Sequence, residues 1–223
     1  MMKLRLLATI LSTAAILSAA DAAQRLETAA GAFMEVMDTP DKSIPQELLA
    51  KAECVIIVPN LKKGAFIIGA KYGKGFATCR KEGGVGWSAP GSIRVEGGSF
   101  GLQIGGSETD VFMLVMNKKG MDRLLSTKFT LGGEAQAAAG PVGRTTQAET
   151  DAAMTAEILT WSRSRGLFAG VSLQGATLRE DKDWNQELYG QGLSNKEIIT
   201  GGRPTPAAAT KLLTELNHYS SRR

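Results

Sequence analysis

The chain has 223 residues, of which 43% are hydrophobic and 22% charged, and it contains a single histidine. This composition is typical of one globular domain large enough to bury a core, and it excludes a largely disordered chain. One histidine excludes a metal centre built from several histidines. The formal net charge of +4 and the pI near 9.1 indicate a mild preference for anionic partners.

Residues 1–22 have the features of a secretory signal peptide. Lys3 and Arg5 precede an apolar run over residues 6–17, and small residues with alanines at positions 20 and 22 follow. The apolar run is shorter than the roughly 20 residues that a membrane-spanning helix needs. We therefore expect cleavage near Ala22, export to the periplasm or secretion, and a mature single domain over residues 23–223 that is soluble or peripheral on a membrane.

The two cysteines, Cys54 and Cys79, leave two interpretations open. In an oxidising compartment they could form a disulfide, which would contribute about 3 kcal/mol in the chain-entropy model. Both also lie among apolar or small residues, as buried free thiols do.

The first predicted element of the mature chain is an amphipathic helix over residues 24–37, because apolar residues recur there at three- and four-residue steps. Docking of its apolar face on the domain is the default expectation, and a membrane interface is the alternative. A second helix should begin after Ser43 and end near Ala52. Short strand-like runs separated by glycines follow, over residues 54–58, 65–72, 76–80, 86–88, 92–95, 99–104 and 111–116.

The second half of the chain mixes helices and strands. A helix is predicted over residues 118–125 and another after Thr146, where Glu149 completes a capping box. Residues 181–185 are predicted as a polar turn, because they open like a calcium loop but lack its glycine and glutamate. Strands are expected over residues 128–131, 135–139, 158–162 and 167–173, and the tail over residues 181–223 should be helical, with helices starting at Ser194 and Thr205. The fold class is therefore α+β: a glycine-rich, largely antiparallel sheet or barrel-like core flanked by N- and C-terminal helices.

The segment 60–81 stands out because it contains six cations and no acidic residue. If they project together from a sheet, they would attract phosphates, and near an anionic bilayer each would contribute about 1 kcal/mol. Lysines at strand edges also discourage aggregation, which is the alternative interpretation. Nucleic acid is a weaker expectation because aromatic residues do not alternate with the basic ones. The six cations are Lys62, Lys63, Lys71, Lys74, Arg80 and Lys81.

A serine hydrolase is a further alternative. Gly97 to Gly101 match the G-x-S-x-G pattern around Ser99, and Asp110 and His218 follow in the order known from α/β-hydrolases. The pattern requires a strand before the serine and a helix directly after it. Residues 100–105 instead alternate like a strand, so we expect no catalytic activity, and no metal or cofactor is predicted.

Several segments together resemble the SYLF domain, a lipid-binding module of bacterial exported proteins and eukaryotic trafficking proteins. The resemblance covers about residues 40–180. It is carried by the segments Ile44-Pro45, Leu48 to Ala52, Lys63 to Phe66, Gly73 to Gly75, Trp87 to Pro90, Gly101 to Gly105, Asp110, Ala139 to Arg144 and Trp161 to Leu173.

The resemblance implies non-enzymatic binding to membrane phospholipids. Some fungal members bind actin and some eukaryotic members bind phosphoinositides, but an exported chain has no evident access to either, so the expected partner is an anionic phospholipid or membrane surface. The helix over residues 24–37 and Lys62, Lys63 and Lys74 match the positions linked to lipid in relatives. Arg144, Arg163 and Arg165 fall in the best-matching segments and are further candidates for contacting phosphate or for satisfying backbone carbonyls. A structural or protein-binding role in the cell envelope is the alternative function.

Overall fold

A computed structural model describes residues 21–39, 43–65, 68–100, 105–142, 156–164, 167–171 and 173–220. Its centre is a nine-stranded sheet in the order β5-β9-β3-β2-β1-β4-β7-β6, with β8 also paired to β7. All neighbours are antiparallel except β6 and β7. The strands are β1 (Cys54–Ala65), β2 (Ile68–Cys79), β3 (Gly91–Phe100), β4 (Gly105–Val115), β5 (Lys128–Thr130), β6 (Ala137–Ala139), β7 (Ile158–Ser164), β8 (Leu167–Gly170) and β9 (Thr177–Glu180).

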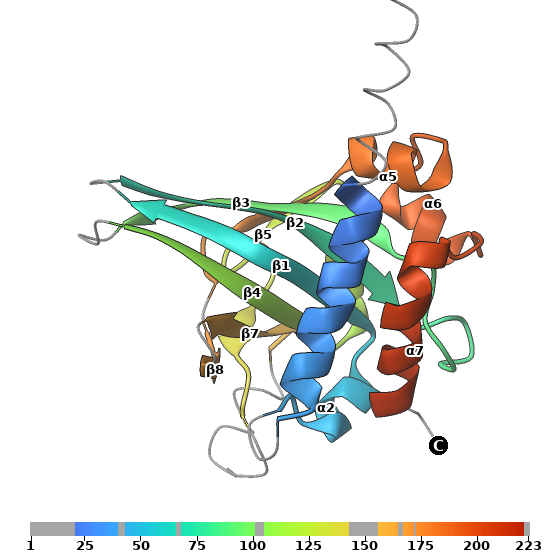
Figure 1. Cartoon of the computed structure of the whole chain (residues 1–223), viewed down its shortest axis with the longest axis horizontal. Helices are drawn as coiled ribbons and strands as arrows, with labels where there is room; N and C mark the ends of the chain where they lie inside the picture. The colour runs from blue at the N-terminus through green and yellow to red at the C-terminus, as the bar shows by residue number, and fades with distance from the viewer. Residues whose placement is uncertain are drawn as a thin grey trace, which may run out of the picture.

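Helices from both ends of the chain pack on this sheet. The N-terminal helix over residues 21–37 and the C-terminal helix α7 lie side by side across one end of the long strands (Figure 1). The other helices are α2 (Gln46–Lys51), α3 (Lys118–Leu124), α5 (Lys182–Tyr189) and α6 (Asn195–Thr200), and α7 itself (Thr210–Tyr219) follows a 3-10 turn over Ala207–Ala209. The expected α+β class, with a largely antiparallel sheet and flanking helices, is confirmed.

The two faces of the sheet bury two separate clusters of side chains. The helix-side cluster joins Phe76 and Trp161 of the sheet to residues of the N-terminal helix and of α7. The opposite cluster contains Ile56, Val95 and Leu178. Successive residues of a strand point to opposite faces, so the two clusters separate neighbouring positions of β1, such as Val55 and Ile56.

Glycines run through the long strands without ending them, which differs from the short runs that the sequence predicted. The predicted runs 65–72 and 76–80 are parts of one strand, β2. At Gly75 a Cβ atom would lie 2.2 Å from the carbonyl oxygen of Ile57, and at Gly73 it would lie 2.7 Å from a methyl group of Leu61. Glycine at these positions therefore allows β2 to approach β1 closely, rather than breaking the strand.

The N-terminal helix is docked on the domain. Its apolar side chains are fully buried in the helix-side cluster, and the ring of Phe33 meets that of Tyr219 edge-on with centroids 6.1 Å apart. Tyr219 also donates a hydrogen bond to Asp38 just after the helix, at 2.7 Å. The docked arrangement is therefore the one that the structure shows. The fully buried residues are Ala22, Leu26, Ala29, Ala30 and Phe33.

Cys54 and Cys79 form a disulfide, the first of the two interpretations that the sequence left open. The two residues are directly opposite partners in β1 and β2, and both are completely buried. The bond fixes the register of the two central strands at one end of the sheet. Residues 1–20, most of the proposed signal peptide, lie outside the described residues. Within the described ranges, no helix is long and apolar enough to cross a membrane.

The tail is helical as predicted, and both helices predicted individually within it are present. Ser194 and Glu197 form the predicted capping box at the start of α6. Residues 181–185, predicted as a polar turn, instead begin α5, with the Asp181 side chain accepting a hydrogen bond from the backbone N–H of Trp184. The predicted helix after Thr146 lies outside the described residues.

Candidate anion-binding site

The four long strands extend well past the helices at one end of the molecule, which we call the distal end (Figure 1). Their ladders continue in register to the last residues of each strand: Ala65 pairs with Gly69 and Gly105, and Ile68 pairs with Phe100. The disulfide lies at the opposite end of β1 and β2, beside the helices. Backbone pairing therefore continues to the distal end of all four strands.

Three lysines from segment 60–81 lie near this end, and we call Lys62, Lys63 and Lys71 the distal lysines. Lys63 and Lys71 are direct cross-strand partners, so two like charges lie on the same face within one strand spacing. Partial burial and the charge of Lys71 lower the pKa of Lys63. Lys62 is exposed, and Glu108 is its ion-pair partner at 3.9 Å, a long and solvated contact. The Lys63–Lys71 pair is thus a site where a bound anion would relieve repulsion.

The other three cations of the segment are separated from the distal lysines. Lys74 forms an ion pair with the buried carboxylate of Asp181 at 2.9 Å and lies 4.4 Å from the centre of the Trp184 ring. Arg80 is only 8% exposed and lies 4.0 Å from the centre of the Trp87 ring. Lys81 is exposed next to Arg80, at the end of β2 far from the distal lysines. The six cations consequently do not form one continuous surface.

Arg80 binds backbone carbonyl oxygens at the ends of two helices. Its guanidinium donates to the carbonyl oxygens of Ser220, at 2.7 Å, and of Leu49, at 3.3 Å. Ser220 also accepts a hydrogen bond from the indole nitrogen of Trp87. Arg80 therefore joins the ends of α2 and α7 to the sheet, a role that depends on its several donors and that sequence alone could not distinguish from phosphate binding.

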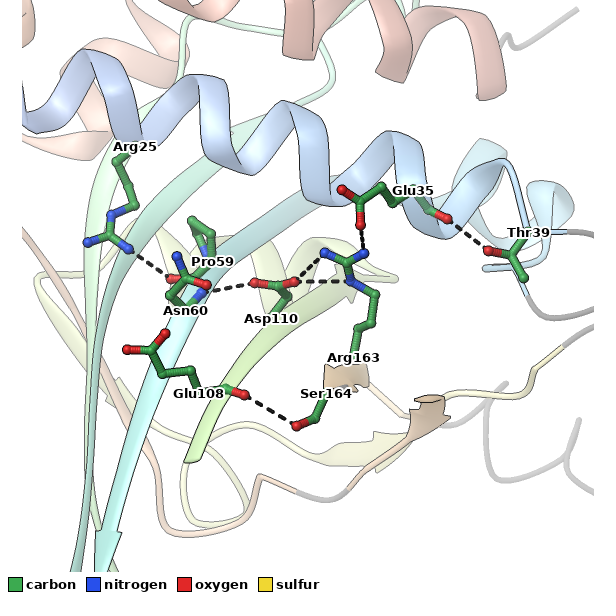
Figure 2. A network of polar contacts seen from close by, with 9 residues as sticks. All are labelled: Arg25, Glu35, Thr39, Pro59, Asn60, Glu108, Asp110, Arg163 and Ser164. Atoms are coloured by element: carbon green, nitrogen blue, oxygen red, sulfur yellow. Dashed lines mark hydrogen bonds and ion pairs between the residues drawn. The ribbon is translucent and has the colours of Figure 1, made fainter. Parts of the chain in front are cut away.

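Arg163, a candidate cation outside the segment 60–81, lies at the centre of a polar network that joins the N-terminal helix to the sheet (Figure 2). Its Nη2 and Nε atoms lie 2.7 and 3.0 Å from one carboxylate oxygen of Asp110 on β4, the strand beside β7. Its Nη1 atom donates to the carboxylate of Glu35 in the N-terminal helix. Arg163 is thus held by two carboxylates, whereas Arg144 and Arg165 lie outside the described residues.

The same network holds an irregular point in β1. The other carboxylate oxygen of Asp110 accepts a hydrogen bond of 2.9 Å from the backbone N–H of Asn60, which has a positive φ of 51° (Figure 2). The pairing of β1 with both neighbours shifts register around this residue, so Asn60 belongs to a β-bulge. Arg25 of the N-terminal helix donates to the carbonyl of the adjacent Pro59 at 3.3 Å. The helix and the bulge therefore stabilise each other.

The hydrolase alternative has no geometric support among the described residues. Ser99 lies within β3, and the next described element is β4 rather than a helix. Asp110 is occupied by Arg163 and by the Asn60 backbone, and His218 is exposed on α7 against Tyr219. No group of three or more His, Cys, Asp or Glu side chains that could hold a metal ion occurs in the described part of the chain.

Comparison with known proteins identifies the family of this chain. Residues 96–219 match the family model Ysc84, described as "Las17-binding protein actin regulator". The chain is 34% identical over 184 residues, 82% of its length, to SH3 domain-containing YSC84-like protein 1 of Homo sapiens and of Mus musculus. It is also 34% identical over 177 residues to Protein YSC84 of Saccharomyces cerevisiae.

The chain belongs to the Ysc84 family, whose shared module is the SYLF domain, so the predicted family is confirmed. It covers 53% of the human relative's length and 37% of the yeast protein's, so it spans about half or less of these relatives. The family description names binding and regulation and not a catalysed reaction. The class of protein that the comparison defines is therefore a family described by binding and regulation.

Proposed function

We propose that this domain binds anionic phospholipids at a membrane surface through the distal lysines. The observation that carries the proposal is the Lys63–Lys71 pair, in which two cations face each other across neighbouring strands with no carboxylate within ion-pair distance among the described residues. Cations opposite each other destabilise a sheet, and a lipid phosphate between them would convert that repulsion into attraction. Lys62 precedes Lys63 on β1 and points to the other face of the sheet, so it would add to the attraction from that face of the distal end.

The shape of the distal end supports contact with a flat surface. The four long strands project beyond the helices, so the distal end can reach a bilayer while the helices stay clear of it (Figure 1). Tyr72, the cross-strand partner of Lys62, is 46% exposed, although large apolar side chains are usually buried. Tyrosine is enriched at membrane–water interfaces, where its ring and hydroxyl match the two environments.

The signal-peptide features of residues 1–22 are the reason for proposing a periplasmic or extracellular membrane surface. On that side of a cell the actin regulation named in the family description would not apply, whereas anionic lipid would be accessible. The docked N-terminal helix takes no part in this proposal, because its apolar face is occupied by the domain's own core.

The test is flotation with neutral and acidic vesicles, using a variant in which all three distal lysines become glutamine. At about 1 kcal/mol for each cation, we expect the triple variant to bind acidic vesicles up to about 100-fold more weakly. The matched control changes three exposed lysines on other surfaces, Lys118, Lys196 and Lys211, to glutamine and so removes the same charge. Equal binding to neutral and acidic vesicles, or equal losses in both triple variants, would exclude the proposed site.

A protein partner in the envelope is a second candidate function, favoured by the edge of the sheet. Among the described strands β8 pairs only with β7, and its first residue, Leu167, is 75% exposed. A free strand edge with an apolar side chain can accept a strand from another protein. Capture of a partner that persists in high salt and is lost in a Leu167→Asp variant, with no effect of the distal lysines, would favour this function over lipid binding.

A further inference from the structure

A row of four cations crosses the sheet on the helix-side face, away from the distal lysines. Lys74 on β2 pairs with Arg94 on β3, and Arg94 pairs with Arg179 on β9. Arg179 in turn pairs with Lys128 on β5. Direct partners lie on the same face, so the four side chains form one straight line over four strands, about 14 Å from end to end. We call these residues the cation row.

The carboxylates that compensate the cation row lie at its Lys74 end and beside its two arginines. Asp181 lies 2.9 Å from Lys74 but 3.8 Å from Arg94, and Glu96 lies 3.9 Å from Arg94 and 3.7 Å from Arg179. Lys128 is exposed and has no ion-pair partner within the described ranges. Electrostatic compensation therefore weakens from Lys74 towards Lys128, and the outer half of the row keeps an excess of positive charge.

The contacts that Arg94 and Arg179 make with carboxylates are ion pairs without a hydrogen bond. The contacts of Arg94 and Arg179 with carboxylates, at 3.7 to 3.9 Å, are longer than hydrogen bonds. The Nε atom of Arg94 is buried and has no hydrogen-bond partner in the described part of the chain. This Nε atom faces the carboxylates of Glu96 and Asp181, so a ligand in the depression would be bound through the other guanidinium nitrogens. Two adjacent guanidinium groups present planar forks that match the oxygens of a phosphate.

An open depression of about 450 Å³ lies over this part of the row. Of its two carboxylates, Glu180 is engaged by Lys182 at 3.4 Å and by the backbone N–H of Asn195 at 3.2 Å, and Asp183 is exposed at the start of α5. Cations outnumber carboxylates in the lining by four to two, so an anion is the ligand that the depression fits. The charged lining residues are Arg94, Lys128, Arg179, Lys182, Glu180 and Asp183.

We propose that the cation row binds a phosphate group, with Arg94 and Arg179 donating hydrogen bonds to its oxygens and Lys128 supplying further charge. The site is separate from the distal lysines, so it goes beyond the proposed function and does not depend on it. The phosphate can be a free ion or the exposed headgroup of a lipid, because both present the same oxygens to the arginines.

Titration calorimetry with pyrophosphate, at two salt concentrations, tests this site on the whole protein. We expect saturable binding that Arg179→Gln weakens at least tenfold and Lys128→Gln weakens about threefold. Lys128 is exposed on a short strand, so its variant keeps the test valid if the arginine variant unfolds. Lys196→Gln, an exposed lysine of α6, is the matched control and should bind pyrophosphate like the original protein.

Absence of saturable binding, or the same loss in the Lys196→Gln control, would overturn the phosphate site. A second arm uses vesicles containing phosphatidic acid. If Arg179→Gln also weakens vesicle binding and pyrophosphate competes with it, the natural source is a lipid headgroup; if only pyrophosphate binding changes, the source is a soluble phosphate. The triple variant of the distal lysines should keep pyrophosphate binding, which separates failure of this site from failure of the proposed function.

Discussion

Replacing Phe33 by alanine tests whether the N-terminal helix is a fixed part of the domain. Phe33 is completely buried, and its ring packs edge-on against Tyr219 of α7. Truncating a buried phenylalanine to alanine typically costs 3 to 5 kcal/mol, a range that includes the lost contact between rings. In a domain of this size that loss corresponds to a fall in Tm of about 10 °C.

The assay combines thermal unfolding, followed by circular dichroism, with flotation on acidic vesicles at a temperature below both transitions. We expect the Phe33→Ala variant to lose stability but to keep its vesicle binding, because the distal lysines are at the other end of the strands. Thr28→Ala is the matched control, since Thr28 is exposed on the same helix and its hydroxyl donates to the carbonyl oxygen of Gln24, one turn earlier. It should change the Tm by less than about 2 °C.

Two results would refute this reasoning. An unchanged Tm in Phe33→Ala would mean that the helix is not docked in solution. Stronger vesicle binding by the destabilised variant would mean that the released helix is itself a membrane-binding element, as amphipathic helices can be. In the second case the distal lysines would not be the main lipid contact.

Two further predictions concern the central strands. Changing Cys54 and Cys79 together to alanine opens a loop with a sequence separation of 25 residues, so we expect a loss of about 3.5 kcal/mol in the free energy of unfolding, measured with denaturant; a loss below about 1 kcal/mol would contradict the chain-entropy account. The pKa of Lys63 is lowered in the folded state, so the unfolded chain binds more protons and stability should rise with pH as Lys63 loses its charge below 10.5. Because the Lys71→Gln variant removes the like charge, the pKa of Lys63 should rise in an NMR titration and the increase of stability with pH should become smaller. The same variant should stabilise the domain at pH 7 by about 0.5 kcal/mol. An unchanged titration of Lys63 would contradict the pairing of the two lysines.

The sequence predicted the elements best where a local pattern decides them. The spacing of Leu26 and Phe33 predicted the first helix, and the Ser194–Glu197 capping box predicted α6. Each of these signals is contained in a short stretch of the sequence. The long strands were predicted as fragments. Gly73 and Gly75 fell between two predicted runs, because their role in the close approach of β2 to β1 depends on the opposing strand.

The cation row could not be predicted, because it depends on the register of distant strands. Arg94 and Arg179 are 85 positions apart in the sequence, and their opposition follows only from the pairing of β3 with β9, a strand that was not predicted. The prediction that the six cations of segment 60–81 project together from the sheet missed their separation for a related reason. Nothing local to Lys74 indicates that Asp181, far along the chain, pairs with it.

The β-bulge at Asn60 shifts by one residue the alternation of β1 side chains between the two faces of the sheet. Cys54, Ile56 and Val58 belong to the opposite cluster, and so does Leu61, an odd number of residues later. Counting in twos from Cys54 would therefore assign each residue beyond Asn60 to the wrong side of the sheet. If Asn60 were paired as a regular strand residue, the lysines that follow it would turn to the opposite faces, whereas deleting it would leave them on their present faces. A single backbone irregularity, held by Asp110 at 2.9 Å, therefore governs which way the charge at the distal end points.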